Sequence, residues 1–143
     1  MKKGGIGGGS TLTGLNFERE RDLLVILERT PGYSVKGNII YYGGKEVARS
    51  YRKYGLYKYL ESRKVNWKKI FSKRLLPDEA LYVIVNNTLF VVEIKFQGTP
   101  GSVDEKLQTC DYKKKQYMKL MAPLNIEVQF MYVLSDWFRK PQY

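Results

Sequence analysis

Two opposite charges, Glu93 and Lys95, stand two positions apart in the otherwise apolar segment of residues 89–96. The composition of this segment is typical of a β-strand, in which side chains two positions apart share one face. Burying an ammonium group and a carboxylate in a strand costs free energy unless each has a partner. Such a departure from the hydrophobic pattern is typical of a functional site. The alternative is an ordinary salt bridge on a solvated face of the strand.

A third charged residue, Asp78, is expected on the same face. Residues 81–85 form the preceding predicted strand, and Asn86-Asn87 suits a two-residue hairpin turn because asparagine tolerates a positive φ. In that register Asp78 lies opposite Lys95, and Asp78 and Glu93 are diagonal neighbours roughly 7–8 Å apart. A slip of one residue would present Glu79 in place of Asp78.

These three side chains suit the hydrolysis of a phosphodiester bond. Two carboxylates on one face can hold Mg²⁺, a hard cation that prefers oxygen ligands and retains several waters. The cation can activate a water molecule and stabilise negative charge on the phosphate. Lys95 can position or deprotonate the attacking water, or neutralise the phosphate in the transition state. The pattern therefore predicts Mg²⁺-dependent catalysis by Asp78, Glu93 and Lys95.

The composition excludes several other kinds of chemistry. The 143 residues include no histidine and a single cysteine, Cys110, which we expect in the core. Histidine-based nucleophilic catalysis, histidine zinc sites and disulfide frameworks are therefore ruled out. Any catalysis has to use carboxylates, lysines, tyrosines or a metal held by oxygen atoms.

The net charge of +11 favours a polyanionic partner. Residues 45–74 carry eleven lysines and arginines against Glu46 and Glu61. We expect this segment to be mostly helical and to form the surface that docks DNA, although a charge run is usually a solvated face. The predicted DNA-binding residues are Arg49, Arg52, Lys53, Lys58, Lys68, Lys69 and Lys73, together with Gln97 and Lys106. Gln97 could equally be a plain loop residue.

The remaining elements predict one α/β domain over residues 1–143, with a mixed central sheet flanked by helices. Residues 1–12 read as a flexible glycine-rich arm without the ending of a phosphate-binding P-loop. A first helix is expected over 16–29, capped by Thr13 or Asn16. A second is expected over 45–74, with a possible break near Gly55. A third is expected over 104–121, capped by Ser102. Strands are expected over 33–42, 81–85, 89–96 and 126–134.

The spacing of Pro77-Asp78 and Glu93-Ile94-Lys95, with fourteen residues between the two acids, resembles the PD-(D/E)xK nuclease superfamily. The flanking segments Gly14–Glu18, Gln97 and Gly101–Leu107 resemble its type II restriction endonucleases, so the resemblance covers about residues 14–121. It implies a restriction-endonuclease-like core, Mg²⁺, cleavage of double-stranded DNA with 5′-phosphate products, and often a homodimer.

The resemblance also implies that a glutamate on the first helix completes the metal site. Glu18 matches that position, and Glu20 is the close competitor. Alternatively, Glu18 only interacts favourably with the helix N-terminus, which is the role expected for Asp104 and Glu105 on the later helix.

Two other functions remain open: a structure-specific nuclease such as a Holliday junction resolvase, and a non-catalytic DNA-binding module. The chain ends soon after the strand over 126–134, so it reads as a compact member, a fragment or one piece completed by a second chain. A homodimer or such a partner is expected, unless Trp137 and Phe138 fold back onto the core. The absence of a signal peptide and of a long apolar run predicts a cytoplasmic location.

Overall fold

The computed structural model describes residues 22–97, 107–139 and 141. The predictions for the glycine-rich arm, for the helix caps Thr13, Asn16 and Ser102, and for the acids Glu18, Glu20, Asp104 and Glu105 lie outside these ranges. The prediction for Lys106 lies outside them as well.

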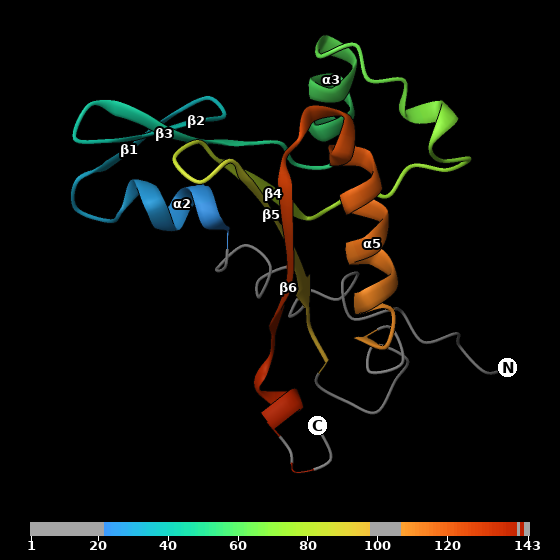
Figure 1. The fold of residues 1–143 in the computed structure, drawn as a ribbon. Coiled ribbons are helices and arrows are strands. Elements are labelled where there is room, and N and C mark those ends of the chain that lie inside the picture. Colours follow the sequence, from blue (N-terminus) through green and yellow to red (C-terminus); the bar gives the residue numbers. More distant parts are fainter. Residues whose placement is uncertain (1–21, 98–106, 140, 142–143) are drawn as a thin grey trace, which may run out of the picture.

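The described residues form a mixed α/β fold around one six-stranded sheet (Figure 1). The strands are β1 (Tyr33–Lys36), β2 (Ile39–Tyr42), β3 (Lys45–Ser50), β4 (Glu79–Val83), β5 (Thr88–Lys95) and β6 (Glu127–Leu134). They lie side by side in sequence order, and all neighbours are antiparallel except β5 and β6. The parallel pair requires a long crossover, which contains helix α5 (Cys110–Met121). The predicted α/β class with a mixed sheet is therefore confirmed.

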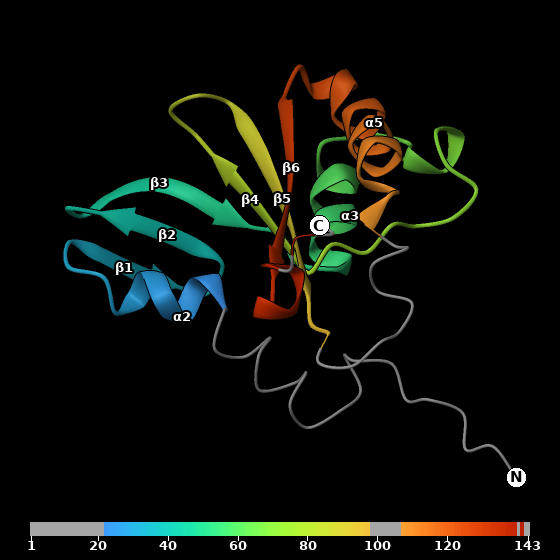
Figure 2. The same cartoon turned by 90° about the horizontal axis from the view of Figure 1, so that it is seen from below.

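The helices divide between two places on the sheet. Helix α3 (Tyr54–Ser62) and helix α5 lie together on one side of strands β4 to β6 (Figure 2). Helix α2 (Leu23–Glu28) lies beside β1 at the other end of the sheet. Three short 3₁₀ turns complete the described elements: η2 (Trp67–Lys69), η3 (Ala122–Leu124) and η4 (Asp136–Arg139). No helix in the described ranges is long and apolar enough to cross a membrane.

Two predicted elements are wrong. The single strand expected over 33–42 is a hairpin, because Gly37 adopts a φ of 61° and turns the chain between β1 and β2. The helix expected from residue 45 is strand β3 up to Ser50, since this segment pairs with β2 on one side and β4 on the other. Its sequence Lys-Glu-Val-Ala-Arg-Ser contains good helix formers, so tertiary pairing overrides local propensity here. The helix that follows begins at Tyr54, so Gly55 lies in its first turn and does not break it. It ends at Ser62, and residues 63–74 contain only the 3₁₀ turn η2, so the predicted helix is wrong there as well.

The hairpin that carries the candidate catalytic residues has a longer turn than predicted. Val83 pairs with Thr88, which leaves four residues in the turn and shifts the register by two. Asn87 stabilises this turn: its side chain accepts a hydrogen bond from the Tyr82 hydroxyl and donates one to the carbonyl of Asn125, each 2.8 Å long. A shift of two residues preserves the faces of both strands. Continuing the observed pairing by one residue places Asp78 opposite Glu93. The sequence had predicted Asp78 opposite Lys95.

The hydrophobic core lies between the sheet and helices α3 and α5. Ala80, Leu89 and Val91 point into it from the sheet, and all three are fully buried. Leu56, Tyr57 and Leu60 from α3 and Tyr117, Leu120 and Met121 from α5 pack against them. Glu93 continues the face of Leu89 and Val91 along β5, so a charged residue lies at the border of this core.

Candidate active site

Glu93 is the buried centre of the candidate site. Its residue is only 6% exposed, and its Oε2 atom lies 2.8 Å from the Nζ atom of Lys113 and 3.2 Å from the Nζ atom of Lys95. Lys95 comes from the same strand, whereas Lys113 comes from α5, which packs over this face. The salt bridge of the alternative interpretation is present, but its solvated face is wrong, because the carboxylate is buried.

Asp78 is held beside Glu93 by the backbone of β5. Its Oδ2 atom accepts a hydrogen bond of 2.9 Å from the backbone N–H of Ile94, the residue after Glu93. Its Oδ1 atom lies 2.6 Å from the Nζ atom of Lys53, which immediately precedes α3. The chain is fixed there as well, since the backbone N–H of Lys53 donates to the carbonyl of Pro77. Asp78 therefore has a defined position one residue before β4.

Tyr117 closes the site toward the core. It is 1% exposed and its ring stacks on Phe130 at 6.1 Å between centroids. Burial raises the pKa of the Tyr117 hydroxyl far above its ordinary value, and the nearby Glu93 carboxylate raises it further. The phenol thus stays neutral. The buried ring also gives the core side of Glu93 low-dielectric surroundings, which strengthens the electrostatic interactions of Glu93.

The structure thus brings together Asp78, Glu93 and Lys95 as the sequence predicted, and it adds two lysines. Lys53 had been assigned to DNA docking alone, and Lys113 was missed. A signal for Lys113 is present in the sequence: it precedes Tyr117 by four positions and Leu120 by seven, on the apolar stripe of the helix. A single lysine on a buried stripe needs a carboxylate partner, and Glu93 supplies it.

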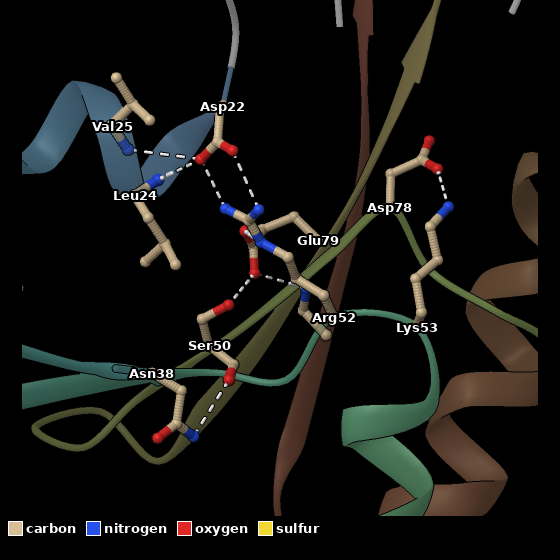
Figure 3. Close-up of polar contacts among 10 residues, drawn as sticks. Asp22, Leu24, Val25, Asn38, Ser50, Arg52, Lys53, Asp78 and Glu79 are labelled. Atoms are coloured by element: carbon tan, nitrogen blue, oxygen red, sulfur yellow. Dashed lines mark hydrogen bonds and ion pairs between the residues drawn. The ribbon is translucent and has the colours of Figure 1, made fainter. Parts of the chain in front are cut away.

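Glu79 belongs to a separate network on the opposite face of the sheet (Figure 3). It is 4% exposed, its Oε1 atom accepts a 2.6 Å hydrogen bond from Ser50, and its Oε2 atom lies 2.8 Å from Nε of Arg52. Because Glu79 and Asp78 point to opposite faces, the register that would place Glu79 beside Glu93 is excluded.

Arg52 extends this network to helix α2. Its guanidinium group contacts both carboxylate oxygens of Asp22, which also caps the helix by accepting from the backbone N–H of Leu24 (Figure 3). The hydrogen bond from Arg52 lowers the pKa of Asp22. Arg52 binds Glu79, and the next residue, Lys53, binds Asp78, which precedes Glu79. These two ion pairs fix the start of β4 from both faces of the sheet.

Replacing Glu79 by alanine is therefore expected to destabilise the fold by about 2–3 kcal/mol, since Ser50 and Arg52 would lose their shared acceptor. Chemical denaturation monitored by circular dichroism would measure this loss. The control is Glu46→Ala, which removes the exposed partner of Arg49 and should leave the denaturation midpoint nearly unchanged. Equal effects of the two substitutions would show that the Glu79 network does not stabilise the protein.

The other predicted site residues have different surroundings. Gln97 is 5% exposed and not part of an exposed loop; its backbone N–H and carbonyl both hydrogen-bond the Ser135 hydroxyl, which joins the ends of β5 and β6. Arg49 pairs with Glu46. Lys58, Lys68, Lys69 and Lys73 are exposed. Cys110 is only partly buried, so its prediction as a core residue is wrong.

A surface cavity of about 540 Å³ lies elsewhere, with lining residues from β3, α3 and α2. Arg49, Arg52, Lys58 and the stacked rings of Tyr51 and Tyr59 contribute to its wall. Neither Asp78 nor Glu93 lines it, so the cavity and the candidate active site are separate features.

The donor atoms of the site fit Mg²⁺. Asp78, just before β4, and Glu93 on β5 offer carboxylate oxygens, and Mg²⁺ is commonly bound by one or two carboxylates together with waters and substrate phosphates. In the described ranges, no group of three or more histidine, cysteine, aspartate or glutamate residues could hold a metal. A third carboxylate from Glu18, as the sequence predicts, would come from outside these ranges.

Comparison of the chain with protein-family models, with curated proteins and with solved structures found no match. What the chain does has to follow from its own residues.

Proposed function

We propose that this chain is a Mg²⁺-dependent endodeoxyribonuclease with a PD-(D/E)xK core, of the type II restriction endonuclease kind. The observation that carries the proposal is the meeting of Asp78, Glu93 and Lys95 on one sheet face, with Glu93 buried among lysines. A buried carboxylate such as Glu93 is costly to maintain for stability alone.

The arrangement of elements supports the same core. Strands β3, β4 and β5 form an antiparallel meander, and α5 then leads to β6 in parallel with β5. The Pro77-Asp78 pair immediately precedes β4, and Glu93-Ile94-Lys95 ends β5. Helices α3 and α5 cover one side of strands β4 to β6, and α2 lies beside β1 (Figure 1 and Figure 2).

In this proposal Asp78 and Glu93 hold Mg²⁺ through their carboxylate oxygens, with Glu18 as the proposed third ligand. The cation supplies, when bound, an activated water and stabilisation of charge on the phosphate. Lys95 donates a hydrogen bond to the attacking water or to a phosphate oxygen. The neutral Tyr117 and the core behind it keep bulk water away from the inner side of Glu93.

Double-stranded DNA is the proposed substrate, because the exposed lysines of the segment 45–74 form a basic surface. Arg52 and Lys53 contact carboxylates, so we assign docking mainly to Lys58, Lys68, Lys69 and Lys73. Within the described ranges these four lysines form no ion pair, and their ammonium groups are available for phosphates.

Charge reversal of Lys68 and Lys69 is expected to weaken binding to every duplex and to lower the log–log salt slope by about 1.8, or about 0.9 per phosphate contact. Fluorescence anisotropy at several salt concentrations would measure both effects. The matched control reverses the charges of Lys36, at the end of β1, and Lys45, at the start of β3. This change should lower the salt slope much less. An equal loss in both pairs would mean that only net charge matters and that η2 does not dock DNA.

The function is tested by incubating the purified chain with plasmid DNA in Mg²⁺ and in EDTA and analysing the ends of the products. We expect nicks or breaks with 5′-phosphates in Mg²⁺ alone. Parallel reactions with a linear duplex and a four-way junction distinguish the restriction-type activity from a junction resolvase. Binding of DNA without cleavage in any divalent cation would support a non-catalytic module instead.

We also propose that a double-strand break requires two copies or a completing second chain, since one site cuts one strand. Strand β6 lies at the edge of the sheet, with Met131 and Leu134 partly exposed. Phe138 is buried, so this residue folds back onto the chain and does not contribute to an open surface. Sedimentation with and without duplex would test the assembly; a monomer that breaks both strands in one encounter would contradict it.

A further inference from the structure

Three ammonium groups surround the two candidate metal-binding carboxylates. Lys95 and Lys113 both lie within 3.2 Å of one oxygen, Oε2 of Glu93. Lys53 lies 2.6 Å from Oδ1 of Asp78. These lysines come from β5, α5 and the segment before α3, so separate parts of the fold place positive charge on this site.

This arrangement supplies the charge that a divalent cation would otherwise supply. A carboxylate as buried as Glu93 needs a compensating positive charge, and Lys113 contacts it most closely. Mg²⁺ would bind the same oxygens at about 2.0–2.1 Å, which brings it next to these ammonium groups. Like charges repel strongly at such distances, so a bound cation and all three lysines cannot keep the present contacts.

Of the two lysines that contact Glu93, Lys113 is the better able to leave. Lys95 is tied to Glu93 by its place two residues along the same strand. Lys113 reaches Glu93 from another element, and its four-carbon stem gives it several rotamers. It can turn from the carboxylate toward solvent without any change in the backbone.

We propose that Lys113 is a displaceable countercharge: it occupies Oε2 of Glu93 while no divalent cation is bound, and on cation binding it moves to a phosphate oxygen of the DNA. This inference rests on the proposed nuclease function and adds a phosphate-contacting residue from α5. No covalent step is required, because one ammonium group exchanges one anionic partner for another.

The test is calorimetric titration of Ca²⁺, an inert stand-in for Mg²⁺, into the chain without DNA. Lys113→Met keeps the length of the stem and removes the charge, so the cation no longer competes. We expect the Kd for Ca²⁺ to fall at least about tenfold in this variant. Lys113→Gln is the second neutral variant should the first fold poorly, and Lys113→Arg should retain weak Ca²⁺ binding.

The control is Lys115→Met on the same helix, which removes an exposed ion pair with Asp111 and should leave the Ca²⁺ affinity unchanged. A second readout is DNA binding in Ca²⁺, for which Lys113→Met should lower the salt slope by about 0.9, the share of one phosphate contact. A purely structural lysine would lower the melting temperature without tightening Ca²⁺ binding.

The two proposals fail differently. Unchanged or weaker Ca²⁺ binding in the neutral Lys113 variants, together with Mg²⁺-dependent nicking by the wild-type chain, would overturn the role of Lys113 alone. No divalent cation binding and no nicking by the wild type or any variant would overturn the nuclease function, and the role of Lys113 with it.

Discussion

Replacing Glu93 by glutamine is expected to lower Mg²⁺-dependent nicking at least about a thousandfold, or about 4 kcal/mol of transition-state stabilisation. Glutamine has nearly the same volume, but it is neutral and a poor ligand for a hard cation. The side chain would also leave Lys95 and Lys113 without their shared countercharge. Initial rates on supercoiled plasmid, at saturating Mg²⁺, would measure the loss.

The matched control for this substitution is Glu79→Gln. Glu79 is equally buried and also binds a basic side chain, but it lies on the opposite face of the sheet. Below its melting temperature this variant should retain most of the wild-type nicking rate. Near-normal nicking by the Glu93 variant would show that Glu93 is not a metal ligand.

Replacing Lys95 by methionine is expected to lower nicking by about 10²–10³-fold, the usual loss when one preorganised donor to a developing charge is removed. Binding of the divalent cation should persist, since Asp78 and Glu93 keep their carboxylates and one competing ammonium group is gone. This combination separates Lys95 from the metal ligands, whose loss removes both cation binding and cleavage.

Lys95→Arg serves as the charge-preserving control and should recover part of the activity, because the guanidinium group keeps the charge but has another shape. Titration with Ca²⁺ beside the nicking assay reports the two functions independently. A Lys95→Met chain that loses cation binding together with nicking would mean that the lysine only supports the structure around Glu93.

The sequence predicted which charged residues share this face of the sheet better than it predicted how they pair across the hairpin. The charges of Glu93 and Lys95 stand out against apolar neighbours, and strand periodicity alone places them on one face. The turn length was misjudged because Asn87 is held by Tyr82 and by Asn125, contacts that depend on folding. The error of two residues was harmless only because it preserved the alternation of faces.

The parts that could not be predicted depend on long-range pairing. Strand β3 contains good helix formers and becomes a strand because β2 and β4 flank it. Arg52 binds Asp22, thirty residues before it, and Glu79, twenty-seven residues after it. No local sequence pattern could predict these two partners. The sequence shows that Lys113 lies on the apolar stripe of its helix. Its pairing with Glu93 could not be predicted, because it depends on how α5 packs against β5.

The central claim is that Asp78 and Glu93 hold one catalytic cation. It is tested most directly by plasmid nicking with the wild-type chain, Asp78→Asn and Glu93→Gln side by side in Mg²⁺, in Ca²⁺ and in EDTA. We predict nicking only for the wild type in Mg²⁺, with DNA binding retained by all three chains. Nicking by the wild type in EDTA, or undiminished nicking by either variant in Mg²⁺, would contradict the account.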